Sequence, residues 1–196
     1  MSLVVAAHNQ ADIVVGFESL STYTTQAGQP FVPNEEVQKV HQINPDLALM
    51  ITGGYASDKI QFVKDYERAV RDTTDLESAF QELFNRTRRS MTIHPRECFQ
   101  IGLAGYTARG PSFRLVTREY GDPNVGYVQA YPLNYYLSGH KESVELAERA
   151  LSENSIASQP TTSEIEKVIR EIIAECIRRY PETLGEPIEA LVLSKP

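Results

Sequence analysis

The first residues of the chain could place a hydroxyl group beside a carboxylate. An apolar run follows Ser2, and a second apolar run, beyond the polar break 9–12, leads into Glu18. Two β-rich runs about such a break predict a tight antiparallel hairpin. If Ala7 faces Ile13, Ser2 lies opposite Glu18, and opposed residues have Cβ atoms about 5 Å apart. The Ser2 hydroxyl could then act as a nucleophile, provided that Ser2 becomes the N-terminal residue and supplies a free amine.

The elements that must position these groups are indicated by turn signals, β-rich runs and apolar stripes at helical spacing. Strands are predicted at 2–8, 13–17, 36–43, 47–52, 99–104, 112–117, 126–131 and 187–193, and helices at 57–71, 74–91, 141–151 and 163–180. Thr74 and Glu77 have the spacing of a capping box. Strand groups alternating with helix pairs favour an α+β fold with two stacked antiparallel sheets between outer helices. The expected architecture is a four-layer αββα sandwich in which residues 1–196 form one domain.

The composition restricts the classes of function. The 196 residues carry a net charge of −7, which argues against nucleic-acid binding because no basic footprint is present. Cys98 and Cys176 lie far apart without metal-ligand spacing, so neither a disulfide framework nor a zinc site is expected. The apolar runs are too short for a membrane span or a signal peptide. A cytoplasmic protein without a membrane partner is therefore expected.

Four short motifs occur in the order and near the spacing found in one enzyme family. They are the Ser2 hairpin ending in Glu18-Ser19, Val37-Gln38-Lys39-Val40 followed by Ile43-Asn44-Pro45, the glycine-containing stretch 51–58, and Leu137-Ser138-Gly139 before a helix. Together they resemble the proteasome β-subunit family and its bacterial relatives of the HslV and Anbu types, which are N-terminal-nucleophile (Ntn) hydrolases. The resemblance extends over essentially the whole chain and implies the αββα sandwich.

The resemblance implies a catalytic set of five residues. Ser2 would be the nucleophile, and its own α-amine, with a pKa of about 7.7–8.0, would be the general base. The Lys39 ammonium would disfavour protonation of that amine, and Glu18 would hold Lys39 in position and keep it charged. The backbone N–H of Gly53 would stabilise the oxyanion, with Ser138 as a supporting hydroxyl near the amine. No metal or organic cofactor is implied.

The resemblance also implies a peptide substrate and a self-assembling protein. Thr22 and Tyr55 align with positions that pair with the substrate backbone, and Val37, Ile51 and Tyr55 align with pocket walls. Relatives form rings or stacked oligomers, so self-association is expected. The sequence does not identify a regulatory ATPase partner.

Departures from the family pattern leave more than one function open. Glu18 replaces the usual aspartate, Leu20 replaces the usual arginine, and Tyr55 stands where a small residue is usual. Exposure of Ser2 requires removal of Met1, which aminopeptidases favour before a small residue. The leading hypothesis is a hydrolase that cleaves peptide bonds. The alternative is a catalytically inactive proteasome-like subunit with an assembly or binding role, and a third hypothesis is a small-molecule amidase on the same scaffold.

The same residues also have ordinary structural interpretations. Considered alone, Glu18 fits an exposed residue at a strand end, and Lys39 fits the polar face of a strand. Gly53 and the glycine after it fit a strand-to-helix turn. His41 and His140 fit surface or hydrogen-bonded histidines better than catalytic ones.

Overall fold

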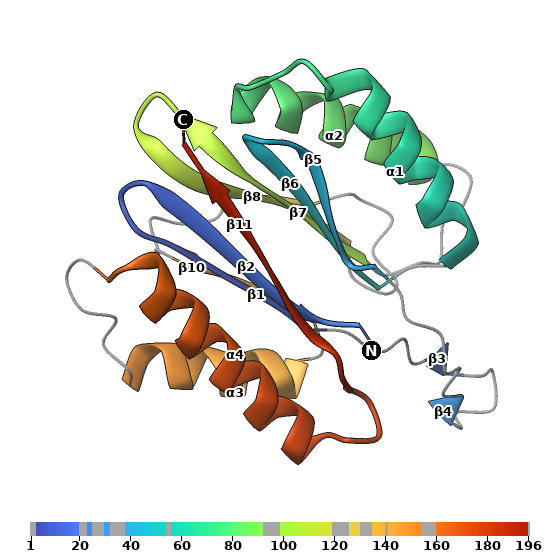
Figure 1. The fold of residues 1–196 in the computed structure, drawn as a ribbon. Coiled ribbons are helices and arrows are strands. Elements are labelled where there is room, and N and C mark those ends of the chain that lie inside the picture. The colour runs from blue at the N-terminus through green and yellow to red at the C-terminus, as the bar shows by residue number, and fades with distance from the viewer. Residues whose placement is uncertain are drawn as a thin grey trace.

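The computed structural model describes residues 3–19, 23–24, 30–31, 38–53, 56–91, 99–118, 126–129, 135–139, 141–153 and 160–195. These residues form a four-stranded and a five-stranded antiparallel sheet, a small two-stranded ladder and four helices (Figure 1). The four-stranded sheet has the order β10 (Tyr135–Gly139), β1 (Leu3–His8), β2 (Asp12–Glu18), β11 (Ile188–Ser194). The five-stranded sheet has the order β5 (Val40–Asn44), β6 (Leu47–Gly53), β7 (Phe99–Thr107), β8 (Gly110–Arg118), β9 (Gly126–Gln129). The predicted α+β class is confirmed.

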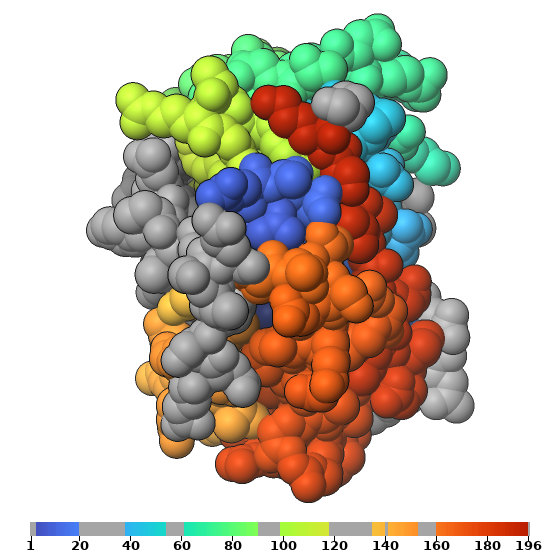
Figure 2. All heavy atoms as spheres, turned by 60° about the vertical axis from the view of Figure 1, so that its left-hand side comes forward, coloured from blue at the N-terminus to red at the C-terminus, as the bar shows by residue number. Residues whose placement is uncertain are grey.

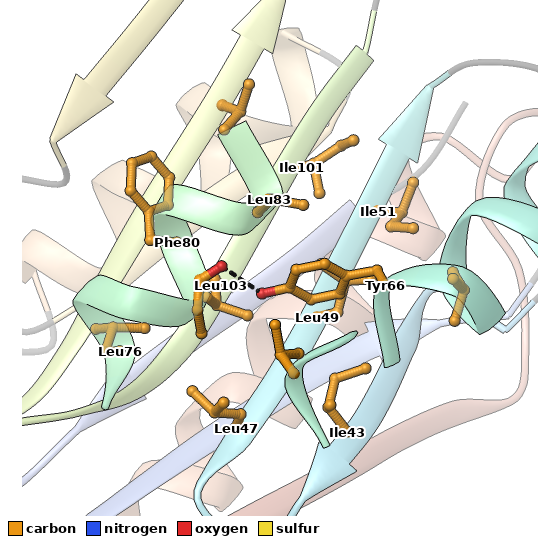
Figure 3. Packing of buried hydrophobic residues seen from close by; sticks show 14 of the residues in the cluster. Ile43, Leu47, Leu49, Ile51, Tyr66, Leu76, Phe80, Leu83, Ile101 and Leu103 are labelled. Atoms are coloured by element: carbon orange, nitrogen blue, oxygen red, sulfur yellow. Dashed lines mark hydrogen bonds between the residues drawn. The ribbon is translucent and has the colours of Figure 1, made fainter. Parts of the chain in front are cut away.

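Two helices, α1 (Ala56–Val70) and α2 (Leu76–Met91), pack on the outer face of the five-stranded sheet (Figure 1). Figure 3 shows Leu49 and Leu103 of the sheet packed against Tyr66 of α1 and Leu83 of α2. The Tyr66 hydroxyl donates a hydrogen bond to the Ala79 carbonyl at 2.9 Å, which joins the two helices. Six apolar residues of the predicted stripes are buried in this core: Val63, Tyr66, Val70, Leu76, Phe80 and Leu83.

The other helix pair, α3 (Lys141–Glu153) and α4 (Thr162–Arg179), packs on the four-stranded sheet. The helix α4 lies especially close to β2 at Gly16, because a Cβ added there would lie only 2.2 Å from Ile169 Cγ2. The helix α4 begins with a capping box in which Thr161 and Glu164 satisfy each other's backbone N–H groups. The sequence interpretation placed the start of this helix near Ser163 and missed the box.

A third core lies between the two sheets. Alternate residues from strands of both sheets contribute to it, such as Val4 and Ala6 of β1 and Ala48 and Met50 of β6. The intervening residues of the same strands face the helices, so both faces of the central strands are buried. This double burial explains why these strands read as nearly continuous apolar runs, and it leaves few places for polar groups.

The first hairpin pairs one residue away from the predicted register. His8 faces Ile13, and extension of this ladder sets Leu3 opposite Glu18. The Leu3 N–H accordingly donates a hydrogen bond to Glu18 Oε1 at 3.0 Å. The prediction that Ser2 lies opposite Glu18 is therefore wrong, and a slip of one residue matters because it reverses which face each side chain occupies.

The cause of this register is a side-chain hydrogen bond at the turn. Asn9 Oδ1 accepts the N–H groups of Ala11 and Asp12 at 2.8 and 2.7 Å, and the Asn9 N–H donates to the Asp12 carbonyl. An asparagine that bonds the backbone two residues ahead closes a tight turn. The loop therefore contains two residues rather than the odd number that the predicted pairing requires.

Neighbouring elements hold the tip of this hairpin. Figure 2 shows the blue β1–β2 turn packed between the yellow-green β7–β8 turn, the red end of β11 and the orange start of α4. The Tyr106 hydroxyl contacts the carbonyls of Ala11 and Leu193 at 2.9 and 2.8 Å. On the other side, Asn9 Nδ2 donates to Thr162 Oγ1 at 3.3 Å. The hairpin is thereby fixed at the end opposite to Glu18.

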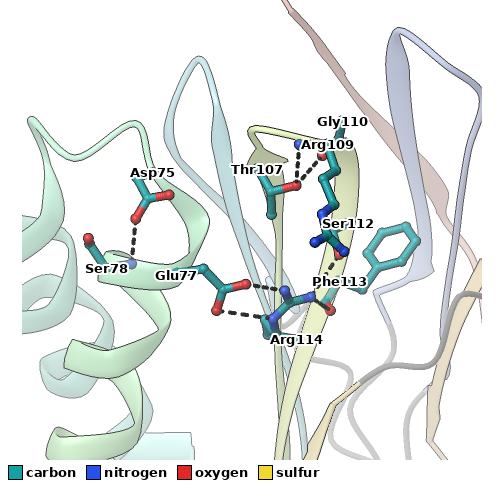
Figure 4. Close-up of polar contacts among 9 residues, drawn as sticks. All are labelled: Asp75, Glu77, Ser78, Thr107, Arg109, Gly110, Ser112, Phe113 and Arg114. Carbon is teal, nitrogen blue, oxygen red and sulfur yellow. Dashed lines mark hydrogen bonds and ion pairs between the residues drawn. The ribbon is translucent and has the colours of Figure 1, made fainter.

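Several boundaries differ from the sequence prediction. The helix α2 is capped by Asp75, whose Oδ2 accepts the Ser78 N–H at 2.8 Å, and not by Thr74 (Figure 4). The strand β10 was not predicted, and neither was the short ladder of β3 (Tyr23–Thr24) with β4 (Pro30–Phe31). Ala69, expected on the buried stripe of α1, is exposed.

An ion pair ties α2 to β8 on the outer side of the five-stranded sheet. The Arg114 guanidinium binds both oxygens of Glu77 and also donates to Ser112 Oγ at 2.7 Å (Figure 4). Arg114 is buried whereas Glu77 is exposed.

No helix within the described ranges is long and apolar enough to cross a membrane.

Candidate active site at the start of the first strand

Each of the nine strands in the two larger sheets has one of its ends at the same end of the molecule. In the four-stranded sheet β1 and β11 begin there and β2 and β10 end there, because neighbouring strands are antiparallel. In the five-stranded sheet β5 and β7 begin at the level where β6 ends. Side-chain contacts between the sheets at this end bring together residues that are far apart in the sequence.

Glu18 and Lys39 form a buried ion pair at this end. Lys39 Nζ contacts Glu18 Oε1, and the two side chains are only 2% and 0% exposed. The Glu18 carboxylate also accepts the N–H groups of Leu3 and Gly185. The peptide group that directly follows position 2 is therefore anchored to the same carboxylate that holds the lysine.

Burial governs the protonation of this pair. Desolvation raises the pKa of the Glu18 carboxyl, and the attraction of Lys39 together with the N–H donors opposes the rise. Desolvation likewise lowers the pKa of the Lys39 ammonium, against the attraction of Glu18. Burial therefore favours the neutral form of each group, and the contact between the two groups favours the charged forms.

The backbone of Lys39 is fixed by the five-stranded sheet. Its carbonyl accepts the Ile51 N–H at 2.8 Å, just before the first residue of β5. Ile51 is buried, and its side chain belongs to the core beneath α1 and α2. The ordinary interpretations of Glu18 as exposed and Lys39 as part of a polar strand face are therefore wrong, since both side chains lie inside the protein.

A second polar cluster joins β10 to β6 and β7. Ser138 Oγ lies 3.1 Å from Thr52 Oγ1, and both side chains are buried. The next residue, Gly139, donates its N–H to Gln100 Oε1 at 3.0 Å. Thr52 is followed by Gly53, an exposed residue with φ of 75°, a backbone conformation that favours glycine.

Comparison with protein-family models and with curated proteins finds no match. A functional assignment for this chain therefore depends on its own residues.

The described residues include only some of the predicted site. Glu18 and Lys39 are brought into contact, and Ser138 contacts the residue that precedes Gly53. Ile51 is linked to this region by the hydrogen bond from its N–H to the Lys39 carbonyl. The other predicted site residues, Ser2, Thr22, Val37 and Tyr55, lie outside the described residues, as does His140.

Three residues of this region were not singled out from the sequence. They are Thr52 and Gln100, which bind Ser138 and Gly139, and Gly185, whose N–H binds Glu18. A signal for two of them exists, because Thr52 and Gln100 are polar residues inside otherwise apolar strands. Buried polar groups need hydrogen-bond partners, so such residues indicate a contact with another element. Nothing in the sequence around Gly185 distinguishes it from any turn glycine.

Within the described residues no three His, Cys, Asp or Glu side chains are grouped to hold a metal ion. The residues gathered here can support the chemistry of a lysine and a carboxylate with hydroxyl and backbone donors. A buried ammonium can lower the pKa of a neighbouring amine and stabilise a developing negative charge.

Proposed function

We propose that this protein is a proteasome-like Ntn hydrolase that cleaves peptide bonds, with Ser2 as its nucleophile after removal of Met1. The observation that carries the proposal is the buried Lys39–Glu18 pair, in which the carboxylate also binds the N–H of Leu3. A buried pair is a weak device for stability, because the desolvation of both ions offsets their attraction. Its position beside the start of β1 fits a catalytic role better.

The arrangement of elements supports the same proposal. Two antiparallel sheets with cores on both faces and a helix pair outside each are compatible with the four-layer αββα sandwich of Ntn hydrolases. In that fold the nucleophile begins a strand at an end of the sheets where other strands terminate. We assign Gly53 as the oxyanion donor and Ser138 as the hydroxyl that supports the amine.

In the proposed reaction the α-amine of Ser2 carries the proton both in the acylation step and in the hydrolysis of the ester. The α-amine of Ser2 removes the hydroxyl proton while Oγ attacks the carbonyl carbon, and the resulting oxyanion binds the Gly53 N–H. The protonated amine then gives its proton to the leaving nitrogen as the C–N bond breaks, which leaves a Ser2 ester. Water attacks this ester, the amine takes a proton from the water, and that proton returns to Oγ as the acid departs. Lys39 stays charged and favours the neutral form of the amine.

The substrate assignment is a peptide held along the edge of the site. Thr22 and Tyr55 would pair with the substrate backbone, and Val37 and Tyr55 would form the pocket walls, with Ile51 buried behind them in the core beneath α1 and α2. The large Tyr55 side chain should make that pocket shallow, so small side chains at the cleaved position are preferred. A panel of fluorogenic peptides and small amides separates this assignment from a small-molecule amidase.

One observation favours the second candidate, a catalytically inactive subunit with an assembly or binding role. Burial lowers the pKa of Lys39, and a neutral lysine would provide no positive charge for the amine or for the alkoxide. In that case the pair would serve only to join the two sheets. The two candidates make different predictions for a protein that has lost Met1.

The test combines intact mass with covalent labelling. Intact mass spectrometry should find a species lighter by one methionine, and that species should form an adduct with a β-lactone or epoxyketone. The adduct should be lost in Ser2→Ala and kept in Ser2→Thr, which retains a hydroxyl. Lys39→Met should abolish labelling, whereas Lys167→Met, the same change at an exposed lysine, should not.

Two results would contradict the proposal. Full retention of Met1 removes the proposed base, because the free amine then belongs to another residue. A Met-free protein that forms no adduct and cleaves no peptide or amide favours the inactive subunit.

We also propose that the protein is cytoplasmic and that it self-associates into a ring or stacked oligomer. The outer helix pairs carry many charged residues and, among the described side chains, only Val192 is a large hydrophobic one that is exposed. An interface would therefore be polar and use the helices and strand edges. Native mass spectrometry should find multiples of 22.0 kDa, and a species of that mass alone contradicts self-association.

A further inference from the structure

Two adjacent residues of the five-stranded sheet hold two consecutive residues of β10 in the opposite sheet. Thr52 and Gln100 face each other across β6 and β7. Thr52 Oγ1 contacts Ser138 Oγ at 3.1 Å, and Gln100 Oε1 accepts the Gly139 N–H at 3.0 Å. One contact therefore fixes a side chain of β10 and the other fixes its backbone.

These contacts are polar in a region where apolar residues would serve for packing. The same inner face of β6 and β7 carries Ala48, Met50, Gly102 and Ala104, which pack against the other sheet without hydrogen bonds from their side chains. Replacing both partners of a buried hydrogen bond with apolar groups is often nearly neutral for stability. The gain from a hydroxyl pair at Thr52 is therefore a defined orientation.

The contacts act at the point where the proposed catalytic groups converge. In the four-stranded sheet Ser138 faces Val4, and Gly139 faces Leu3, whose N–H is bound by Glu18. On the other side, Thr52 is bonded through its own peptide group to Gly53. A single hydrogen bond between Thr52 and Ser138 thus sets the distance from the proposed oxyanion donor to the proposed supporting hydroxyl.

The hydrogen bonds also have a direction. The Thr52 hydroxyl donates to the Gln100 carbonyl across a long contact of 3.5 Å. Either hydroxyl can donate in the contact between Thr52 and Ser138, and when the Thr52 proton is used for the Gln100 carbonyl, Ser138 is the donor. In that arrangement the lone pairs of Ser138 Oγ can accept a hydrogen bond from another group. A neutral amine that donates one N–H to Ser138 keeps its own lone pair directed elsewhere, as a general base requires.

We propose that Thr52 and Gln100 are positioning residues, which hold Ser138 as a hydrogen-bond acceptor and hold the backbone of Gly139 in place at the active site. This inference rests on the proposed function, because the group that Ser138 would accept from is the α-amine of Ser2. The two residues need not touch substrate, and their effect is transmitted through Ser138 and Gly139.

The experiment compares Thr52→Val, which removes the hydroxyl at constant volume, with Thr52→Ser, which keeps it. The rate of β-lactone labelling is measured against pH for both variants. Thr52→Val should lower the rate about 10- to 100-fold, as expected for a misplaced catalytic group. It should also lower the pKa seen in the profile, because Ser138 no longer accepts a hydrogen bond from the protonated amine. Thr52→Ser should keep the labelling rate and the pKa of the pH profile at their wild-type values.

A matched variant separates positioning from stability. Thr87 is also a buried threonine, and its hydroxyl donates to the Leu83 carbonyl within α2, away from β10. Thr87→Val should reduce the melting temperature to a similar extent and leave the labelling rate and its pH profile unchanged. Gln100→Met should speed hydrogen exchange of the Gly139 amide, and Thr52→Ser should not.

The outcomes distinguish this inference from the proposed function. If Met-free wild-type protein is labelled and Thr52→Val keeps the wild-type rate and profile, Thr52 is structural only and the inference is wrong. Unchanged exchange of the Gly139 amide in Gln100→Met overturns the role of Gln100. If Met-free wild-type protein is inert, the proposed function fails and the positioning role fails with it, whatever the Gly139 exchange shows.

Discussion

Lys39 Nζ and the Glu18 carboxylate form an ion pair between the two sheets, although the residues are 21 positions apart and both side chains are almost fully buried. Glu18 ends β2 of one sheet, and Lys39 precedes β5 of the other. Removal of one partner from a buried pair leaves the other charge unpaired, at a cost of about 3–5 kcal/mol. The pair therefore couples the positions of the two sheets.

This coupling predicts a strongly non-additive pair of substitutions. Lys39→Met and Glu18→Gln should each lower the free energy of unfolding by about 3–5 kcal/mol. The double variant should lose less than either single variant, because no buried charge is left unpaired and the amide oxygen introduced by Glu18→Gln still accepts the N–H of Leu3. Urea denaturation of all four proteins measures the coupling energy. Additive losses in the double variant would show that the pair has no mutual stabilisation.

The pKa directions of the same pair predict how stability depends on pH. The pKa of Glu18 is raised above 4.5 in the folded protein, so between 4.5 and the raised value only the folded state binds the proton, and stability falls as pH rises. The pKa of Lys39 is lowered below 10.5, so between the lowered value and 10.5 only the unfolded state binds the proton, and stability rises with pH.

The measurement is the difference in unfolding free energy between wild type and the double variant Glu18→Gln, Lys39→Met across that pH range. The difference should decrease as pH rises from 4.5 and increase again as pH approaches 10.5. An increase just above the lower of these pH values would mean that the attraction of Lys39 outweighs burial and that the pKa of Glu18 is lowered.

The close approach of α4 to β2 predicts a second non-additive pair. A methyl group at Gly16 would meet Ile169 Cγ2 at 2.2 Å and Ile173 Cδ1 at 3.0 Å. Gly16→Ala should therefore lower the free energy of unfolding by about 1–3 kcal/mol through overpacking. Ile169→Ala alone should cost about 2–5 kcal/mol by leaving a cavity. The double variant should lose less unfolding free energy than the two single variants lose in sum, because the smaller side chain at position 169 makes room for the added methyl group. Strictly additive losses would show that α4 moves away from β2 instead.

The turn of the first hairpin predicts a difference between two neighbouring residues. Asn9 accepts the N–H groups of Ala11 and Asp12 and donates to the Pro160 carbonyl at 3.2 Å. Asn9→Ala should cost about 1–3 kcal/mol, because the two N–H groups lose their acceptor and the turn loses its link to α4. Gln10→Ala, at the exposed next position, should change stability by less than about 0.5 kcal/mol.

Thermal denaturation of both variants checks this prediction, and hydrogen exchange at Asp12 reports on the turn itself. Equal effects of the two substitutions would show that side-chain bonding at Asn9 does not set the register.

Much of the fold could be predicted from local patterns. The spacing of Val63, Tyr66 and Val70 indicates a helix, and all three residues are buried in the core beneath that helix. Paired β-rich runs about turn residues indicate the first two hairpins. Such patterns are reliable because hydrogen bonds within a helix or across a short turn involve residues that are close in sequence. The strand β10 was missed because Tyr135–Gly139 is short and its partner in the sheet, β1, is more than a hundred residues away.

The sequence by itself determined the α+β class and the four helices among the described residues. Its family resemblance also singled out Glu18, Lys39, Gly53 and Ser138 as members of one predicted site. Only the tertiary structure decided that Glu18 binds the N–H of Leu3 and that Lys39 is buried. It also decided that Thr52 and Ser138, 86 positions apart, are in contact. The reason is physical: periodicity fixes which residues share a face, whereas turn length sets the register and the packing of two sheets sets the partner.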